Sequence, residues 1–132
     1  MKCIVVTPEA TVLDVDATFV ALPLFDGEIG IGENHTPLVG RLGFGELRIH
    51  QDKETTSLCV DGGFVEVLNN TISLLTNRAV PSGSLDLDKS RTELEEALKK
   101  TAVTEDQLKL KTENVAAARA QVRLAEKYAG KR

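Results

Sequence analysis

The chain contains no tryptophan, and aromatic residues make up only 4% of its 132 residues. Its core must therefore be built from aliphatic side chains, which the 42% hydrophobic content can supply. No apolar run approaches the roughly 18 residues that a membrane-spanning helix needs. The apolar start of the chain is soon interrupted by Pro8, too early for a signal peptide. We therefore expect neither a helical membrane span nor a signal peptide.

Cysteine and histidine are also scarce, with two of each. Cys3 and Cys59 lack metal or redox spacing, so we expect free, partly buried thiols in a reducing compartment, with a disulfide between them as the less favoured alternative. His35 and His50 have no further ligand at zinc-binding spacing. Nothing places either histidine beside a nucleophile such as Ser57. We therefore expect no catalytic residue and no metal site.

Residues 1–81 show short strand patterns separated by turn signals. Leu13 to Val20 alternates between apolar and polar side chains, which is typical of a half-buried strand. The glycine-rich run from Gly27 is expected to turn the sheet at an exposed loop tip while Ile29 and Ile31 face inward. Further turns are expected at Gly43–Gly45, at Gly62–Gly63 and, with positive φ, at Asn69–Asn70. The pattern predicts eight or nine short antiparallel strands in a β-sandwich or flattened barrel.

Helical patterns follow a Pro-Ser-Gly-Ser segment, which marks the boundary between two domains. We expect a β-sandwich domain over 1–81, a linker over 82–85 and a two-helix hairpin over 86–132. Asp86 is suited to cap the first helix, and its apolar stripe is expected to consist of Leu87, Leu94 and Leu98.

The second helix is expected to begin near residue 105, after a Thr104–Gln107 capping box, and to stop at Gly130. At about 37 Å it would be longer than the first helix, so part of it should lack a partner. Its apolar stripe is narrow and rich in alanine, so the hairpin should be weakly held and suited to a two-state change. The residues of this stripe are Leu108, Val115, Ala118, Val122 and Ala125.

Charge is distributed unevenly along the chain. Residues 1–84 carry 5 basic and 11 acidic side chains, whereas residues 107–132 carry 7 basic and 2 acidic ones. A basic tail on an acidic domain indicates contact with an acidic partner or a phosphate, with a solvated helix face as the alternative. Arg119 and Arg123 share one helix face, and with Arg91 they could grip a triphosphate. The alternative is surface ion pairing, for example of Arg91 with Asp88 or Glu95.

Four spaced segments together resemble the epsilon subunit of F-type ATP synthases. They are Val6-Thr7-Pro8, the run from Gly27 to Leu38, the run from Gly62 to Leu68, and Leu87-Asp88-Lys89-Ser90-Arg91. The resemblance implies a non-catalytic rotor subunit that couples ion flow through the membrane ring to rotation and ATP synthesis. Its sandwich would bind the gamma subunit and the c-ring, and its helices would fold up or extend toward the catalytic head of alpha and beta subunits. It would lie at the cytoplasmic face of the bacterial inner membrane as a peripheral protein.

The resemblance also implies roles for single residues. Glu28 and His35 would contact the c-ring, although both side chains also fit ordinary turn positions. Asp88, Arg91, Arg119 and Arg123 match an ATP-binding motif of some family members, with Thr92 where the motif has alanine. ATP would then be a regulatory ligand, and no cofactor would be required. A basic face would meet acidic loops of the catalytic subunits and hinder ATP hydrolysis; it would consist of Lys109, Lys111, Arg119, Arg123 and Lys127.

Two other classes of function are weighed beside this one. A free-standing ligand-binding β-sandwich, with the helices as a lid, would be found alone, whereas a rotor subunit would co-purify with gamma. A nucleic-acid binder is disfavoured because the net charge is −4 and the tail has only Tyr128 for base stacking.

Overall fold

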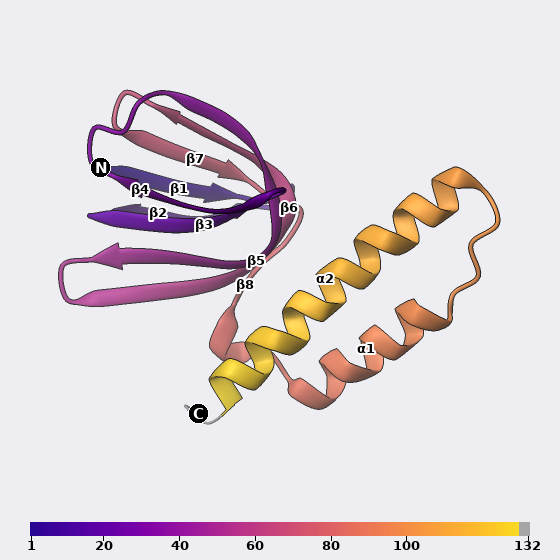
Figure 1. The fold of residues 1–132 in the computed structure, drawn as a ribbon. Helices are drawn as coiled ribbons and strands as arrows, with labels where there is room; N and C mark the ends of the chain where they lie inside the picture. The colour runs from indigo at the N-terminus through magenta and orange to yellow at the C-terminus, as the bar shows by residue number, and fades with distance from the viewer. Residues whose placement is uncertain (130–132) are drawn as a thin grey trace. The chain divides into compact units, whose positions relative to one another are not determined.

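The computed structural model describes residues 1–129, and it divides after Pro81 into two compact units. Eight strands form the first unit, and a short 3₁₀ turn with two helices forms the second (Figure 1). No helix among the described residues is long and apolar enough to cross a membrane. The elements are β1 (Lys2–Val6), β2 (Thr11–Asp16), β3 (Phe19–Leu24), β4 (Gly27–Gly32), β5 (Leu38–Gln51), β6 (Glu54–Leu68), β7 (Thr71–Leu75), β8 (Ala79–Pro81), η1 (Ser82–Ser84), α1 (Leu87–Lys99) and α2 (Glu105–Ala129).

The strands pair in the order β2-β1-β7-β6-β5-β3-β4, and β8 pairs with β6. Every pairing is antiparallel except that of β1 with β7, which is parallel. The long strands β5 and β6 connect the half of the sheet that contains β1, β2 and β7 to the half that contains β3 and β4. The sheet curls back on itself (Figure 1). The predicted sandwich followed by two helices is confirmed, with one parallel pair that the sequence did not indicate.

The turns expected at Gly43–Gly45 and Gly62–Gly63 are wrong. Each site lies inside one long strand, and the β5–β6 ladder continues past both without a shift of register. The glycines bend the ladder instead of ending it, because Gly62 and Gly63 have φ of 67° and 111°, which side chains rarely adopt. On β6 the inward side of the strand changes at this bend: Leu58 and Val60 are buried before it, Val65 and Val67 after it.

Two further boundaries differ from expectation. The strand predicted from Leu13 to Val20 is divided, since β2 pairs with β1 while β3 pairs with β4 and β5. Between them the Ala17 amide donates to the Met1 carbonyl oxygen at 2.7 Å, and the Thr18 amide donates to that of His50 at 2.8 Å. The run from Gly27 is a regular strand, and the turn lies before it.

The core is aliphatic, as its composition requires. Ile31 is fully buried and Ile29 packs against the core, as predicted, although both lie within a strand and not at a turn. Cys3 and Cys59 are both buried, and neither forms a disulfide. Burial, with the nearby Asp14 charge, raises the pKa of the Cys3 thiol to about 12, so this thiol stays protonated near neutral pH. The largest fully buried side chains are Leu22, Ile31, Leu47, Ile49, Ile72 and Leu74.

Both predicted helix starts are confirmed by their caps. The Asp86 side chain accepts a hydrogen bond from the Lys89 amide at 3.0 Å. Thr104 and Gln107 form a reciprocal capping box. The backbone N–H of Gln107 donates to Thr104 Oγ1 at 3.1 Å, and the backbone N–H of Thr104 donates to Gln107 Oε1 at 3.2 Å. The predicted stop at Gly130 lies outside the described residues.

The apolar stripes of the helices are only partly as predicted. Ala118 and Ala125 are buried, but Leu98 and Leu108 are 45% and 57% exposed. For Leu108 the cause is the difference in length, because α2 has 25 residues and α1 has 13. The first turns of α2 extend past the end of α1 (Figure 1), so Leu108 has no helix opposite it. The prediction of an unpartnered part of the second helix is confirmed.

Candidate functional site

Glu28 lies within β4, opposite Pro23 of β3, and not at the loop tip expected for it. Its side chain is 55% exposed and forms an ion pair with Arg48 of β5, whose Nη2 donates to Glu28 Oε1 at 2.8 Å. The alternative of a solvated turn glutamate is therefore wrong about the turn, because Glu28 lies within a strand. Glu28 presents a carboxylate that is both accessible and held.

Arg48 connects Glu28 to a second carboxylate. Its Nη1 donates to Glu46 Oε1 at 3.3 Å, and the Ser57 hydroxyl donates to Glu46 Oε2 at 2.6 Å. The Glu46 side chain is only 9% exposed. Sequence reasoning missed Arg48 and Glu46, since only their i, i+2 spacing on one face of a strand hinted at them. Their neighbourhood with Glu28 depends on β3 lying between β5 and β4.

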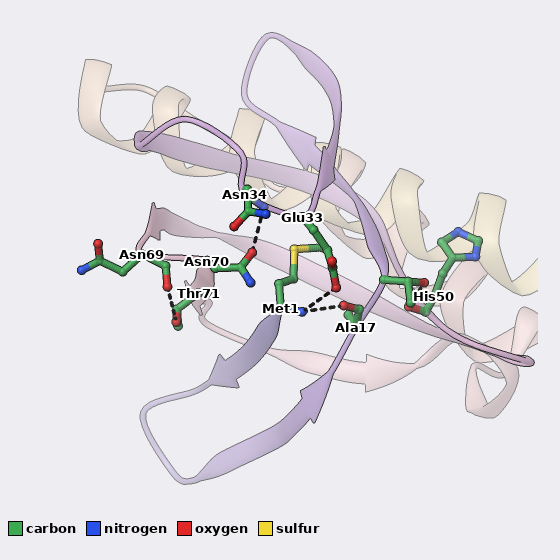
Figure 2. A network of polar contacts seen from close by, with 9 residues as sticks. Met1, Ala17, Glu33, Asn34, His50, Asn69, Asn70 and Thr71 are labelled. Carbon is green, nitrogen blue, oxygen red and sulfur yellow. Dashed lines mark hydrogen bonds and ion pairs between the residues drawn. The ribbon is translucent and has the colours of Figure 1, made fainter.

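His35 lies beyond the other end of β4, and the structure does not bring it to Glu28. The strand alone spans about 13 Å from Glu28 to its last residue. His35 Nδ1 lies 2.7 Å from the Thr36 carbonyl oxygen, so the ring donates from Nδ1. The adjacent Asn34 has a positive φ of 58°, and its backbone N–H donates to Asn70 Oδ1 at 2.8 Å (Figure 2). His35 therefore belongs to a tied loop that is distinct from the Glu28 surface.

The loop after β4 is also tied to the start of the chain. The Met1 amino group donates to the Ala17 carbonyl oxygen at 3.0 Å and lies 3.2 Å from Glu33 Oε1 (Figure 2). The turn at Asn69–Asn70, with φ of 51° and 56°, confirms the positive-φ turn predicted there. These contacts hold two turns of the sandwich next to each other.

An exposed apolar row lies on the outward face of β5, β6 and β7. Arg41, Phe64 and Leu75 are consecutive partners across these strands. The Arg41 guanidinium lies 5.0 Å from the centre of the Phe25 ring. Phe64 is 59% and Leu75 56% exposed, while Phe25 and Val39 are more exposed still. Apolar side chains that gather in this way mark interaction surfaces more often than isolated ones do. We call Phe25, Val39, Arg41, Phe64 and Leu75 the apolar row.

In the helical unit, Arg91 of α1 faces Glu126 of α2, with Nη2 3.5 Å from Oε1. This partner differs from Asp88 and Glu95, which the sequence had suggested. Arg119 and Arg123 precede Glu126 by seven and three residues, so all three lie on one side of α2. The three arginines expected to act together thus come from both helices of the hairpin, and all three are exposed. Asp88 lies in the first turn of α1, where its carbonyl oxygen accepts from the Thr92 hydroxyl at 3.0 Å.

Four of the five basic residues expected to form one face do so by helical geometry. At about 100° per residue, Lys109, Arg119, Arg123 and Lys127 fall in one stripe along α2. Lys111 lies about 120° around the helix from the middle of this stripe, so helical geometry sets it apart from the other four. We call the four residues on one side the basic stripe.

Other kinds of site find little support in the described part of the chain. Across residues 1–129, no three His, Cys, Asp or Glu side chains gather as metal ligands. An open hollow of about 530 Å³ lies beside the β1–β2 turn and the segment before β8. Its charged side chains, Glu9 and Arg78, are exposed, so it offers no buried group to orient a ligand.

Comparisons with known proteins agree on one family. Residues 1–82 match the model of the ATP synthase delta/epsilon chain β-sandwich domain. The ATP synthase epsilon chain of Rhodopirellula baltica is 44% identical over 93% of this chain and 96% of its own length. That of Thermosynechococcus vestitus is 40% identical over 67% of this chain and 64% of its own length.

Two solved structures share the fold. A chain of the Euglena gracilis mitochondrial ATP synthase, in a structure of OSCP, F1 and the c-ring, has a TM-score of 0.78 at 20% identity and covers 89% of this chain and 76% of its own. A chain of the Tetrahymena thermophila mitochondrial ATP synthase central stalk and c-ring has a TM-score of 0.71 at 16% identity and covers 96% and 93%. At these identities the likeness concerns the fold alone.

Proposed function

The chain belongs to the ATP synthase delta/epsilon family, and from this premise we propose that it is a non-catalytic central-stalk subunit of an F-type ATP synthase. The observation that carries the proposal is the 44% identity to an epsilon chain over 93% of the sequence, which includes both units. In this role the sandwich links the gamma subunit to the c-ring, and so couples ion flow to rotation. The protein is peripheral, bound through the complex at the cytoplasmic face of the bacterial inner membrane.

We assign the gamma contact to the apolar row. A stalk subunit must hold its neighbour through many turns, which requires an apolar anchor on a rigid element. Phe64 and Leu75 supply one on paired strands, and Arg41 between Phe25 and Phe64 adds a cation that can stack on or pair with a partner group. The polar surface around Glu28 is the contrasting candidate for the ring.

Replacing Phe64 with glutamate tests the gamma contact. We expect binding to the head complex of alpha, beta and gamma subunits to weaken at least about thirtyfold, because a central aromatic anchor is worth about 2 kcal/mol or more. Biolayer interferometry measures the affinity of each variant for a head complex from which this chain has been removed. The matched control is Val12→Glu, which places the same charge on an exposed residue of β2 outside the row. Equal affinities of the two variants would place the gamma contact elsewhere.

For the ring contact we retain Glu28, whose exposed carboxylate suits the basic loops of a membrane-embedded ring. His35, also proposed to contact the ring, would meet it at a different point from Glu28, since β4 lies between them. Its tied loop, held through Asn34 and Asn70, gives it a defined position for such a contact.

We further propose that the helical unit binds ATP as a regulatory ligand through Arg91, Arg119 and Arg123. Guanidinium groups suit phosphate oxygens because they donate two parallel hydrogen bonds. The Glu126 carboxylate now lies beside Arg91, so phosphate binding would compete with this ion pair. Bound ATP would favour the folded hairpin by its greater affinity for that state.

A calorimetric titration of the full chain with ATP checks this site. We expect saturable binding that Arg119→Ala weakens by about tenfold or more, since hydrogen bonds to charged groups contribute about 1.5–3 kcal/mol. Glu126→Gln should strengthen binding, because it removes the carboxylate that competes for Arg91. Lys111→Ala is the control, as it removes a cation that lies about 12 Å along α2 from Arg119. Absence of binding at millimolar ATP would refute the nucleotide site and leave the stalk assignment intact.

A further inference from the structure

We propose that Arg48 and Glu46 are positioning residues that hold Glu28 for contact with a cationic side chain of the ring. The inference rests on the ring contact proposed above and adds to it the residues that make Glu28 effective. Ser57–Glu46–Arg48–Glu28 forms a continuous chain of contacts of 2.6, 3.3 and 2.8 Å from β6 to β4. We call these four residues the carboxylate relay.

Glu28 has little else to fix its side chain. Its neighbour in sequence is Gly27, the next residue on its own face of β4 is Gly30, and Pro23 stands opposite. A glutamate so placed would sample several rotamers, and docking would have to select one at a cost in entropy. The Arg48 guanidinium removes much of this freedom before the partner arrives.

The register of the sheet allows this reach. Arg48 pairs with Ala21 of β3, and Ala21 pairs with Gly30 of β4. Ala21 carries only a methyl group, so the long arginine side chain can pass over β3 to Glu28, while the Phe19 ring lies against Gly30. A larger residue in place of Ala21 would stand in its way.

Glu46 solves the electrostatic problem that Arg48 creates. An arginine paired with Glu28 alone would cancel the negative charge that attracts a cation. With Glu46 included, two carboxylates share one guanidinium, and the relay keeps a net charge of −1. Glu46 is held in turn by the Ser57 hydroxyl and is nearly buried, so the accessible end of the relay is Glu28. Glu28 is thus both fixed in direction and still anionic.

The test uses the assembled enzyme. Membrane vesicles depleted of this chain are titrated with purified full-length variants, and the half-saturating concentration that restores ATP-driven ion pumping is measured at several salt concentrations. The variants are Glu28→Gln, Arg48→Met, Arg48→Lys, Glu46→Gln and the double variant Glu28→Gln with Arg48→Met. Circular dichroism melting of each variant shows whether the sandwich is intact.

We expect Arg48→Met to raise the half-saturating concentration about three- to tenfold, the equivalent of one side chain that must be ordered on docking. Arg48→Lys should recover part of the loss, because an ammonium group keeps the charge but cannot bridge both carboxylates as a fork. Glu46→Gln should flatten the salt dependence, because the relay becomes neutral. The double variant should be no weaker than Glu28→Gln alone, since Arg48 acts only through Glu28. A purely structural arginine would give additive losses and an unchanged salt dependence.

The outcomes separate this inference from its premise. If Glu28→Gln weakens docking while Arg48→Met leaves it unchanged, the positioning role is refuted and the ring contact stands. Tighter docking of Arg48→Met also refutes it, since Arg48 would then compete with the ring's cation. If Glu28→Gln itself has no effect, the proposed ring contact fails, and the inference fails with it.

Discussion

Replacing Gly63 with alanine is expected to lower the free energy of unfolding of the sandwich by about 3–5 kcal/mol, enough to unfold much of the protein at physiological temperature. Gly63 has a φ of 111°, and a Cβ there would overlap the Leu75 carbonyl oxygen and lie 2.8 Å from Thr76 Cα. Both obstacles are backbone, so no side chain can turn aside to relieve them. Urea unfolding followed by circular dichroism measures the loss, since the chain has no tryptophan to report on folding.

The control for this substitution is Gly32→Ala in β4. A Cβ at Gly32 would meet nothing within 4 Å, and its φ lies outside the positive range. We expect a change within about 1 kcal/mol, because alanine also reduces the entropy of the unfolded chain. If Gly63→Ala were as stable as Gly32→Ala, the bend in β6 would not need glycine. Loss of the bend in Gly63→Ala would also weaken the proposed gamma contact, since the bend presents Phe64 and Leu75 on the apolar row.

Removal of everything after Pro81 is expected to raise ATP hydrolysis by the reconstituted enzyme about five- to tenfold while ion pumping remains coupled, as a coupling free energy of about 1–1.5 kcal/mol implies. The sandwich should survive truncation, because its core cluster lies entirely within residues 1–81. The helical unit is lost with its basic stripe, which is the part proposed to meet acidic loops of the catalytic subunits. Steady-state hydrolysis and proton-pumping assays on the same vesicles give both readouts.

A matched pair of charge reversals in the full chain tests the cause. Lys109→Glu changes the basic stripe, whereas Lys111→Glu makes the same change about 120° around α2 from the middle of this stripe. We expect only the first to relieve inhibition, and its effect should shrink at high salt. Unchanged hydrolysis after truncation would remove the inhibitory role of the helices and leave the coupling role of the sandwich in place.

Local signals in the sequence predicted local structure well. The side chains of Asp86 and Thr104 cap their helices as expected, and Asn69–Asn70 forms the predicted positive-φ turn. In each case the interaction involves only residues a few positions apart, so the local sequence is enough to predict it. Glycine is the exception: the sequence marks Gly62 and Gly63 as special positions, but the strand end that it predicts there is wrong. A positive φ suits a bend in a ladder as well as a turn, and only the partner strand distinguishes them.

The sequence by itself determined the class of fold, the aliphatic core, the helix starts and the family, because these follow from periodicity, composition and spaced motifs along one chain. The tertiary structure alone decided which charges meet. Arg48 reaches Glu28 across an intervening strand, and Arg91 faces Glu126, 35 residues away along the chain. Such pairs depend on strand order and on how two helices face each other. Many exposed carboxylates could satisfy each arginine about equally well, so only the packed fold selects the partner.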